Sequence, residues 1–217
     1  SVLRNRLIEE GIIVTGDAVD LDDLTPARDR GAATTLFTYQ SPTLAQIARP
    51  LLKDSINLYG EAFMRLNAEK GAFPTNDAAL EGLRKRLAAW GLPEGSYELV
   101  DGSGLSRRDA ISPEAILTVL LRMSDPSVSS PFVAALPVAG VDGSLATRMK
   151  ATAAEGNVRA KTGTMSNIRS MAGYVTARNG EHLAFVIVIN NFEGTGAAAN
   201  QAIDNIAVRL AEFTRTP

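Results

Sequence analysis

Three β-rich runs close together near the C-terminus constrain the fold more than any other feature of this sequence. They cover Val158–Thr162, Met171–Thr176 and His182–Ile189. The pair Asn179-Gly180 between the second and third runs is typical of a tight hairpin, so we predict an antiparallel meander. The third run is almost entirely apolar, which predicts that it is buried on both faces.

Helical patterns precede and follow the meander. We expect helices at 2–10, from Ser41-Pro42 with an interruption at Pro50, at 58–66, 77–90, from Ser112-Pro113, and at 197–214, and short strands at 12–15 and 34–39. The closing helix has a predicted apolar side that comprises Ala202, Ile206, Leu210 and Phe213. The acidic stretch 17–30 fits no calcium-loop spacing and is interpreted as a solvated connection. Together these elements predict an α+β fold in which helices cover an antiparallel β-meander.

Composition excludes several classes of function. The 217 residues carry a formal charge of −2 without a basic stripe, so nucleic acid is not expected as a partner. The longest apolar run, 183–189, is too short to span a bilayer. Cysteine is absent and His182 is the only histidine, which excludes a thiol nucleophile and disfavours both an imidazole base and a zinc site. We therefore expect no metal and no cofactor.

The motif Lys161-Thr162-Gly163-Thr164 carries the strongest chemical signal. An ammonium, two hydroxyls and a glycine at the end of a strand form a plausible cradle for a carboxylate. Strand geometry places Thr162 and Thr164 on one face and Lys161 and Gly163 on the other. Glycine also lets a ligand lie against the backbone. The motif suits an acyl-transfer enzyme that acts on a peptide C-terminus, although a Lys-Thr-Gly triplet alone is weak evidence.

Two upstream elements are each ambiguous when taken alone. Ser55 and Asn57 form an S-x-N element at a helix junction, where Ser55 or Asp54 could simply cap the next helix. The glycine-rich stretch 101–108, Asp-Gly-Ser-Gly-Leu-Ser-Arg-Arg, matches neither a phosphate loop nor a nucleophile elbow, and spacing alone favours a structured connection.

In combination, these elements closely resemble the C-terminal part of the class C low-molecular-mass penicillin-binding proteins, the D-alanyl-D-alanine carboxypeptidase/endopeptidases. Four motifs occur in the order of that family: 55–57, 101–107, 136–145 (Leu-Pro-Val-Ala-Gly-Val-Asp-Gly-Ser-Leu) and 161–164. The resemblance extends from residue 11 to the last helix. It implies part of the serine β-lactamase/penicillin-binding transpeptidase-like fold and a serine acyl-enzyme mechanism on peptidoglycan stem peptides.

The resemblance also implies roles for individual residues. Ser55 would relay protons to the leaving D-alanine amine, and Asn57 would bind the acyl-side amide of the substrate. Lys161 would supply positive potential to the proton network. Thr162, Gly163 and Thr164 would hold the terminal carboxylate, and the Thr164 backbone N–H would serve the oxyanion hole.

One departure from the family is decisive for activity, because no S-x-x-K motif occurs in these 217 residues. We therefore expect residues 1–217 to be the C-terminal portion of the catalytic domain, without the upstream nucleophile segment and inserted domains, and to be inactive alone. The resemblance implies a bacterial periplasmic location, although no signal peptide occurs in this sequence. It also implies peptidoglycan peptides and β-lactams as partners. An apolar sheet face would remain for an N-terminal fragment of the same protein or for self-association. The alternative is an inert module that binds D-alanyl carboxylate termini or a protein partner.

Overall fold

The computed structural model describes residues 1–20, 23, 34–35, 37–70, 74–125 and 129–215. It divides into two compact units, Ser1–Ser41 and Pro42–Pro217. Each unit is described by itself.

The first unit contains helix α1 (Val2–Glu9), as predicted. The Ser1 hydroxyl accepts a hydrogen bond from the Arg4 backbone N–H and caps the helix. The strand expected at 12–15 is wrong, because these residues follow the helix as an irregular segment in which Ile13 is 88% exposed. The described positions of 34–39 are not a strand either, and position 36 and most of 17–30 lie outside the described residues. A strand needs a partner for its backbone groups, and local alternation does not supply one.

Helices α2 (Leu44–Lys53), α3 (Asn57–Arg65) and α4 (Asn76–Ala89) begin the second unit. Thr43, not Ser41, caps α2, and it forms a capping box with Gln46. The interruption expected at Pro50 is also wrong. Proline removes one N–H donor, but α2 continues to Lys53 and the Asp54 N–H reaches the Pro50 carbonyl at 3.1 Å.

A short two-stranded sheet follows, which the sequence patterns did not predict. Strand β1 (Tyr97–Glu98) pairs in antiparallel register with β2 (Ala110–Ile111), and the glycine-rich stretch lies in the loop between them. Helix α5 (Pro113–Met123) then begins as predicted, because the Ser112 hydroxyl accepts from the Ala115 N–H. Helix α6 (Ser129–Ala135) and the short 3₁₀ helix η2 (Gly143–Leu145) lead to the main sheet.

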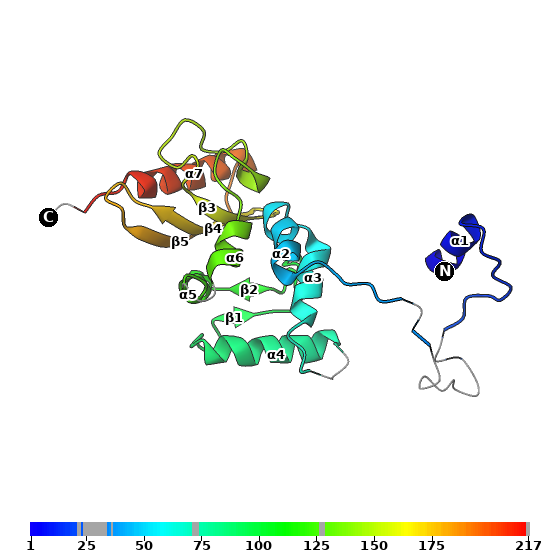
Figure 1. Cartoon of the computed structure of the whole chain (residues 1–217). Helices are drawn as coiled ribbons and strands as arrows, with labels where there is room; N and C mark the ends of the chain where they lie inside the picture. Colours follow the sequence, from blue (N-terminus) through cyan, green and yellow to red (C-terminus); the bar gives the residue numbers. More distant parts are fainter. Residues whose placement is uncertain (21–22, 24–33, 36, 71–73, 126–128, 216–217) are drawn as a thin grey trace. The chain divides into compact units, whose positions relative to one another are not determined.

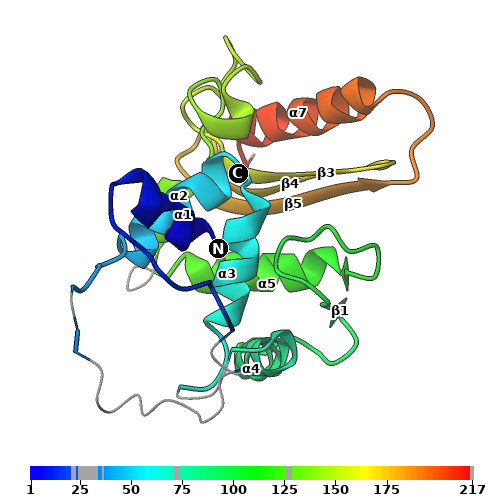
Figure 2. The same ribbon diagram turned by 90° about the vertical axis from the view of Figure 1, so that its right-hand side faces the viewer.

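The main sheet is the predicted meander. Strands β3 (Arg159–Met165), β4 (Ile168–Thr176) and β5 (His182–Asn190) pair antiparallel in that order. Helix α7 (Gly196–Glu212) covers one face of the sheet and α5 lies against the other (Figures 1 and 2). The prediction of an α+β fold with helices over an antiparallel meander is therefore confirmed.

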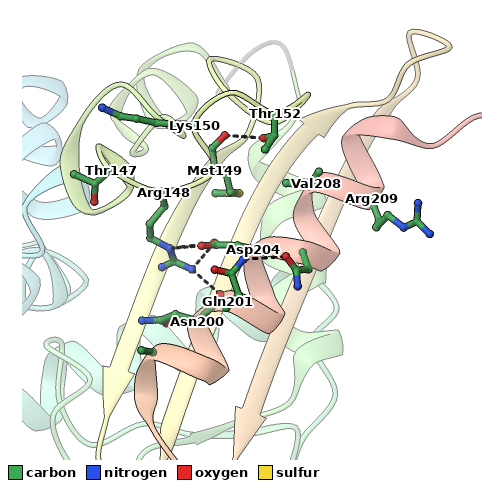
Figure 3. A pocket seen from close by; sticks show the side chains of 12 residues that line it. Thr147, Arg148, Met149, Lys150, Thr152, Asn200, Gln201, Asp204, Val208 and Arg209 are labelled. Atoms are coloured by element: carbon green, nitrogen blue, oxygen red, sulfur yellow. Dashed lines mark hydrogen bonds and ion pairs between the residues drawn. The ribbon is translucent and has the colours of Figure 1, made fainter.

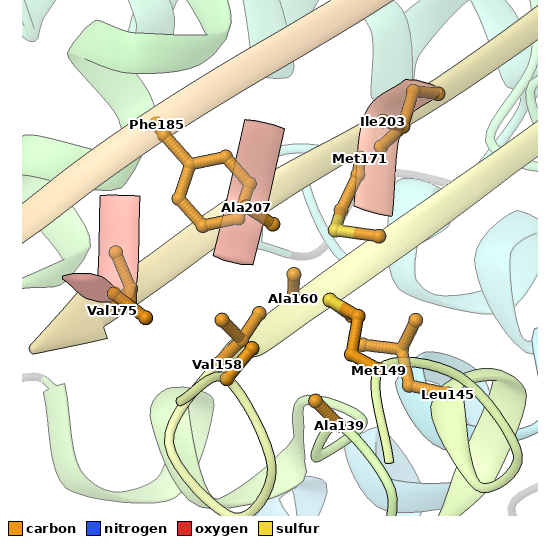
Figure 4. Close-up of a cluster of buried hydrophobic side chains, with 12 residues drawn as sticks. Ala139, Leu145, Met149, Val158, Ala160, Met171, Val175, Phe185, Ile203 and Ala207 are labelled. Carbon is orange, nitrogen blue, oxygen red and sulfur yellow. The ribbon is translucent and has the colours of Figure 1, made fainter. Parts of the chain in front are cut away.

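The main core lies between the sheet and α7 (Figure 4). Met171, Val175 and Phe185 project from the strands onto Ile203 and Ala207 of α7. The predicted apolar side of α7 is therefore displaced around the helix. Its member Ile206 is 45% exposed, because Ile203 and Ala207 occupy the contact instead.

The opposite face of the sheet, which carries Lys161, Ala172 and Val186, is only half-buried. The expectation that the third run is buried on both faces is wrong, because Phe185 is the one buried residue among 182–190 and the others are half-buried or exposed. Helix α5 packs chiefly on β5 and so leaves the β3 side of this face less covered. Lys161, the residue of the sequence motif with the strongest chemical signal, lies on this half-buried face.

Candidate active site

The structure brings Ser55 and Lys161 together. The Lys161 Nζ donates to the Ser55 Oγ at 2.8 Å and to the carbonyl of Thr162 at 2.8 Å. Burial lowers the pKa of the Lys161 ammonium below its ordinary value of 10.5. The contact joins the strand motif to the S-x-N element. The alternative that Ser55 or Asp54 simply caps the next helix is wrong, because α3 has no side-chain cap. Residue 56 precedes α3 and provides no side-chain cap.

Ser55 adopts a backbone conformation that serine rarely takes. Its φ of 56° lies in the left-handed region, where a side chain costs about 1–2 kcal/mol. The residue lies in the turn between the end of α2 and the start of α3. Asn57 is the first residue of α3 and is exposed. Strain of this kind is common at functional sites, where the surrounding structure holds it in place.

An ion pair near Ser55 fixes the turn in place. Lys53, the last residue of α2, donates to the Asp142 carboxylate at 2.6 and 2.7 Å and to the Leu136 carbonyl at 2.8 Å. The Asp142 carboxylate also accepts from the Val138 N–H at 2.9 Å. Burial alone would raise the pKa of Asp142, but these donors and the Lys53 charge hold it below its ordinary value. The segment that ends in Ser55 is thereby tied to the turn that carries Asp142, which precedes β3 in the chain.

The three residues predicted to hold a carboxylate differ in their surroundings. Thr162 donates through its Oγ1 to the Ser144 Oγ at 2.8 Å, and Thr164 is exposed. A side chain at Gly163 would collide with the Ser170 Oγ of the neighbouring strand. Glycine therefore leaves room for the Ser170 hydroxyl, which would have to rotate away if position 163 carried a side chain.

Arg169 supports the end of this strand from β4. It lies directly across from Thr164, and its guanidinium donates to the carbonyls of Met165 and Ile168 at 2.7 Å. The Arg169 guanidinium also lies over the Phe192 ring, 5.5 Å from its centroid. The hairpin that carries Thr164 is thus held at its turn.

The glycine-rich loop is a structured connection, as its spacing favoured. The Asp101 carboxylate accepts from the backbone N–H groups of Gly104 and Ser106 and from the Ser103 hydroxyl. Burial raises the pKa of the neighbouring Asp109, and the charge of Asp101 raises it further. Glu61 of α3 accepts from the Gly102 and Ser103 N–H groups, which joins the loop to the helix that follows Ser55.

Other chemistries find less support in the described residues. His182 is exposed and lies beside the Thr176 hydroxyl, where a surface position was expected. The described part of the chain contains no group of three or more histidine, aspartate or glutamate side chains that could hold a metal. Within the same residues, no helix has both the length and the apolar character needed to cross a membrane.

One cavity in the described part of the chain is lined by none of these site residues. It has a volume of about 810 Å³ and is lined by the stretch 147–152 and by α7. Arg148 reaches across to Asp204 at 2.6 Å (Figure 3). Both side chains are largely buried and paired with each other, so the cavity wall is a structural link between this loop and α7.

Sequence reasoning missed Lys53, Asp142 and Ser144 as parts of the site. Asp142 and Ser144 lie within the third motif, 136–145, to which no role was given. The signal was therefore present as a motif without chemistry. Lys53 carried no signal beyond its position two residues before Ser55.

A model of the D-Ala-D-Ala carboxypeptidase 3 (S13) family matches residues 1–213. The chain belongs to this family. The D-alanyl-D-alanine carboxypeptidase of Actinomadura sp. (strain R39) is 39% identical over 224 residues, which cover 98% of this chain and 40% of that protein. The penicillin-sensitive carboxypeptidase A of Dictyostelium discoideum is 33% identical, covering 82% of this chain and 36% of that protein. The predicted resemblance to D-alanyl-D-alanine carboxypeptidases is confirmed.

Solved structures agree with the S13 assignment. Penicillin-binding protein 4 of Haemophilus influenzae, complexed with a β-lactam, matches with a TM-score of 0.70 and 26% identity over 77% of this chain and 41% of that one. An extended-spectrum β-lactamase matches with a TM-score of 0.60 at 13% identity, over 78% of this chain and 63% of that one, which supports the fold alone. The chain spans about two fifths of the length of the two carboxypeptidases it matches.

Proposed function

We propose that these residues form the carboxylate-binding and proton-relay part of a serine-type D-alanyl-D-alanine carboxypeptidase/endopeptidase that acts on peptidoglycan stem peptides. One observation carries the proposal, the 2.8 Å contact between the Lys161 Nζ and the Ser55 Oγ. The contact joins an ammonium whose pKa is lowered by burial to a hydroxyl, and two threonines that can bind a carboxylate lie on the same strand as the lysine. Membership of the S13 family supports the same substrate class.

Each residue has one task in this proposal. Lys161, whose pKa burial lowers, shares a proton with Ser55, and Ser55 passes a proton to the leaving D-alanine amine. Asn57, exposed at the start of α3, binds the acyl-side amide of the substrate. Thr162 and Thr164 donate to the terminal carboxylate. Gly163 has no side chain, so the substrate can lie close to the backbone of the strand.

The nucleophile in this proposal is the serine of an S-x-x-K motif outside residues 1–217, since none occurs within them. Its oxygen attacks the carbonyl carbon of the penultimate D-alanine, and the peptide C–N bond breaks. The nitrogen takes a proton through Ser55 and D-alanine leaves, after which water hydrolyses the acyl-enzyme. The segment that carries this serine packs on the half-buried face of the sheet at Lys161. Alternatively, a second copy of this chain covers the same face of the sheet by self-association.

β-Lactams occupy the same site in this proposal, because their carboxylate and reactive amide imitate the D-alanyl terminus. Penicillin-binding protein 4 of H. influenzae, the structural relative, is itself complexed with a β-lactam. Because the proposed substrate lies in the cell wall, we also propose a bacterial periplasmic location.

Intact mass spectrometry before and after incubation with a β-lactam tests the proposal. We expect the protein isolated from its native source to gain the mass of one drug molecule, and the 217-residue chain alone to gain none. Failure of the native protein to acylate would refute the enzymatic proposal. Acylation of residues 1–217 alone would refute the assignment of the nucleophile to another segment.

The absence of S-x-x-K from these residues favours one second candidate, a module that binds D-alanyl carboxylate termini without turnover. This module predicts binding of a D-alanyl-D-alanine peptide by the native protein together with no acylation. Calorimetry on the sample used for mass spectrometry separates the two functions.

A further inference from the structure

We propose that Ser144 is a third hydroxyl of the carboxylate-binding site and donates a hydrogen bond to the terminal carboxylate of the substrate. The inference rests on the proposed function and adds a residue to it. Its starting point is the 2.8 Å contact between the Thr162 Oγ1 and the Ser144 Oγ.

Ser144 is the exposed member of a turn whose other parts are fixed. It is the middle residue of η2 (Gly143–Leu145), and Leu145 beside it is completely buried in the main core. The Leu145 carbonyl accepts from the Gly140 N–H at 3.0 Å. The turn therefore has little freedom to withdraw the Ser144 hydroxyl from Thr162.

The preceding residues of the turn are held by the end of α2. A Cβ at Gly143 would lie 2.8 Å from the carbonyl oxygen of Lys53, so the two backbones touch at this point. The Asp142 carboxylate receives two short hydrogen bonds from Lys53. These contacts place Ser144 relative to Ser55 as well as to Thr162, before any ligand is bound. A donor fixed in advance loses little conformational entropy on binding.

The chemistry of a hydroxyl pair favours a carboxylate as the ligand. Each hydroxyl has one proton, and one of the two protons is used in the bond between Ser144 and Thr162. With Thr162 as the donor in that bond, the Ser144 proton is left for a ligand. A carboxylate oxygen accepts such a bond strongly because it is ionised. The half-buried Lys161 ammonium, in the residue next to Thr162, adds positive potential.

Calorimetry with N-acetyl-D-alanyl-D-alanine and its C-terminal amide tests the inference on the native protein. We expect Ser144→Ala to weaken binding of the acid about 10-fold, the effect of losing one hydrogen bond to a charged group. Binding of the amide should stay unchanged. Thr147→Ala removes an exposed hydroxyl three residues further along the same loop and should change neither affinity. Ser144→Thr keeps the hydroxyl and should retain most of the affinity for the acid.

The outcomes distinguish this inference from the proposed function. If the wild type prefers the acid and Ser144→Ala binds it normally, the inference is overturned and the proposed function stands. If Ser144→Ala weakens acid and amide equally, Ser144 only braces Thr162 and the inference is again overturned. If the wild type shows no preference for the acid, the proposed carboxylate site and the inference both fall. Equal melting temperatures for wild type and Ser144→Ala would show that a loss of binding is not a loss of folding.

Discussion

Lys53→Met removes the ammonium that joins the end of α2 to the turn before β3. The wild-type Nζ makes three contacts of 2.6–2.8 Å, two with the Asp142 carboxylate and one with the Leu136 carbonyl. Methionine has a similar length and keeps the packing of the stem, so the substitution isolates the charge and its hydrogen bonds. Asp142→Asn removes the opposite charge and leaves an acceptor for the Val138 N–H.

The exposure of the two partners sets the size of the effect. The Lys53 side chain is 12% exposed and the Asp142 side chain 37%, so water can partly rehydrate the carboxylate once the ammonium is gone. A hydrogen bond to a charged group contributes about 1.5–3 kcal/mol, and the partial exposure reduces the sum of three such contacts. We expect Lys53→Met to cost about 2–3 kcal/mol and Asp142→Asn about 1–2 kcal/mol. For a domain of this size, the Lys53→Met loss corresponds to a fall in Tm of about 4–12 °C.

Urea unfolding of the two single variants and the double variant measures the coupling. We expect the double variant to be at least about 1 kcal/mol more stable than the sum of the single losses predicts. Lys150→Met, at an exposed position, is the control for loss of a lysine charge. Strict additivity, or a Lys53→Met loss no larger than that of Lys150→Met, would refute the role given to this ion pair.

The same pair predicts an acid dependence. Folding lowers the pKa of Asp142 from its ordinary value of 3.8. The paired carboxylate therefore contributes stability above pH 3.8 that is lost as the pH falls through the lowered pKa. Asp142→Asn should lose less stability than the wild type between pH 4 and the acid limit of the measurement, about pH 2.

Three further predictions concern other residues. Burial lowers the pKa of Lys161 in the folded protein, so the wild type should gain stability as the pH rises from this lowered pKa to the ordinary value of 10.5. Lys161→Met should lack this gain. It should match Lys150→Met in urea unfolding at pH 7 and lose binding of the acid ligand. Ser55→Gly should be about 0.5–1 kcal/mol more stable than Ser55→Ala in urea unfolding, because glycine accepts the positive φ while both variants lack the hydroxyl; equal stabilities would show that the turn is unstrained. Arg148→Met should cost about 3 kcal/mol in urea unfolding because it leaves a buried carboxylate unpaired, whereas Arg209→Met, in an exposed and longer ion pair, should stay within about 0.5 kcal/mol; similar losses would contradict this difference.

Local sequence signals predicted the elements whose pattern is complete within a few residues. The cap at Ser112 and the Asn-Gly turn at 179–180 depend on neighbouring backbone groups, and both occur as expected. The meander followed from the three β-rich runs and this turn. The capping box of α2 involved Thr43 instead of Ser41, because the choice between two candidate caps depends on the residue three positions later, and only Thr43 has a glutamine, Gln46, at that place.

Features that depend on tertiary contacts were not predicted. The strand expected at 12–15 needed a partner that its own residues could not reveal. The buried side of α7 was displaced because Ile203 and Ala207, rather than Ile206, face the main core. Burial of a side chain depends on what another segment places against it, and hydrophobic periodicity leaves the exact direction of a helix face open.

The residues of the candidate site also divide into those that sequence motifs predicted and those that only the structure revealed. The motif around Lys161 and the serine at position 55 were predicted as chemistry, and the structure brings the two residues into contact. Ser144 was present only as part of a motif to which no chemistry was given. Lys53 acts through Asp142, which lies far along the chain, so its own sequence neighbourhood contained no sign of a role. A side chain that orients another residue is recognisable only after the fold has placed both.

The contact between Ser55 and Lys161 closes a chain segment of 106 residues. Bringing the ends of such a loop together costs about 4 kcal/mol in chain entropy from its length alone. The contact can therefore form only after α5, η2 and the strands have recovered that cost through their own packing. During synthesis, the left-handed turn at Ser55 leaves the ribosome long before the lysine that it meets. A spectroscopic probe at this contact would consequently report completion of the whole second unit, and its signal should be the last to appear in refolding.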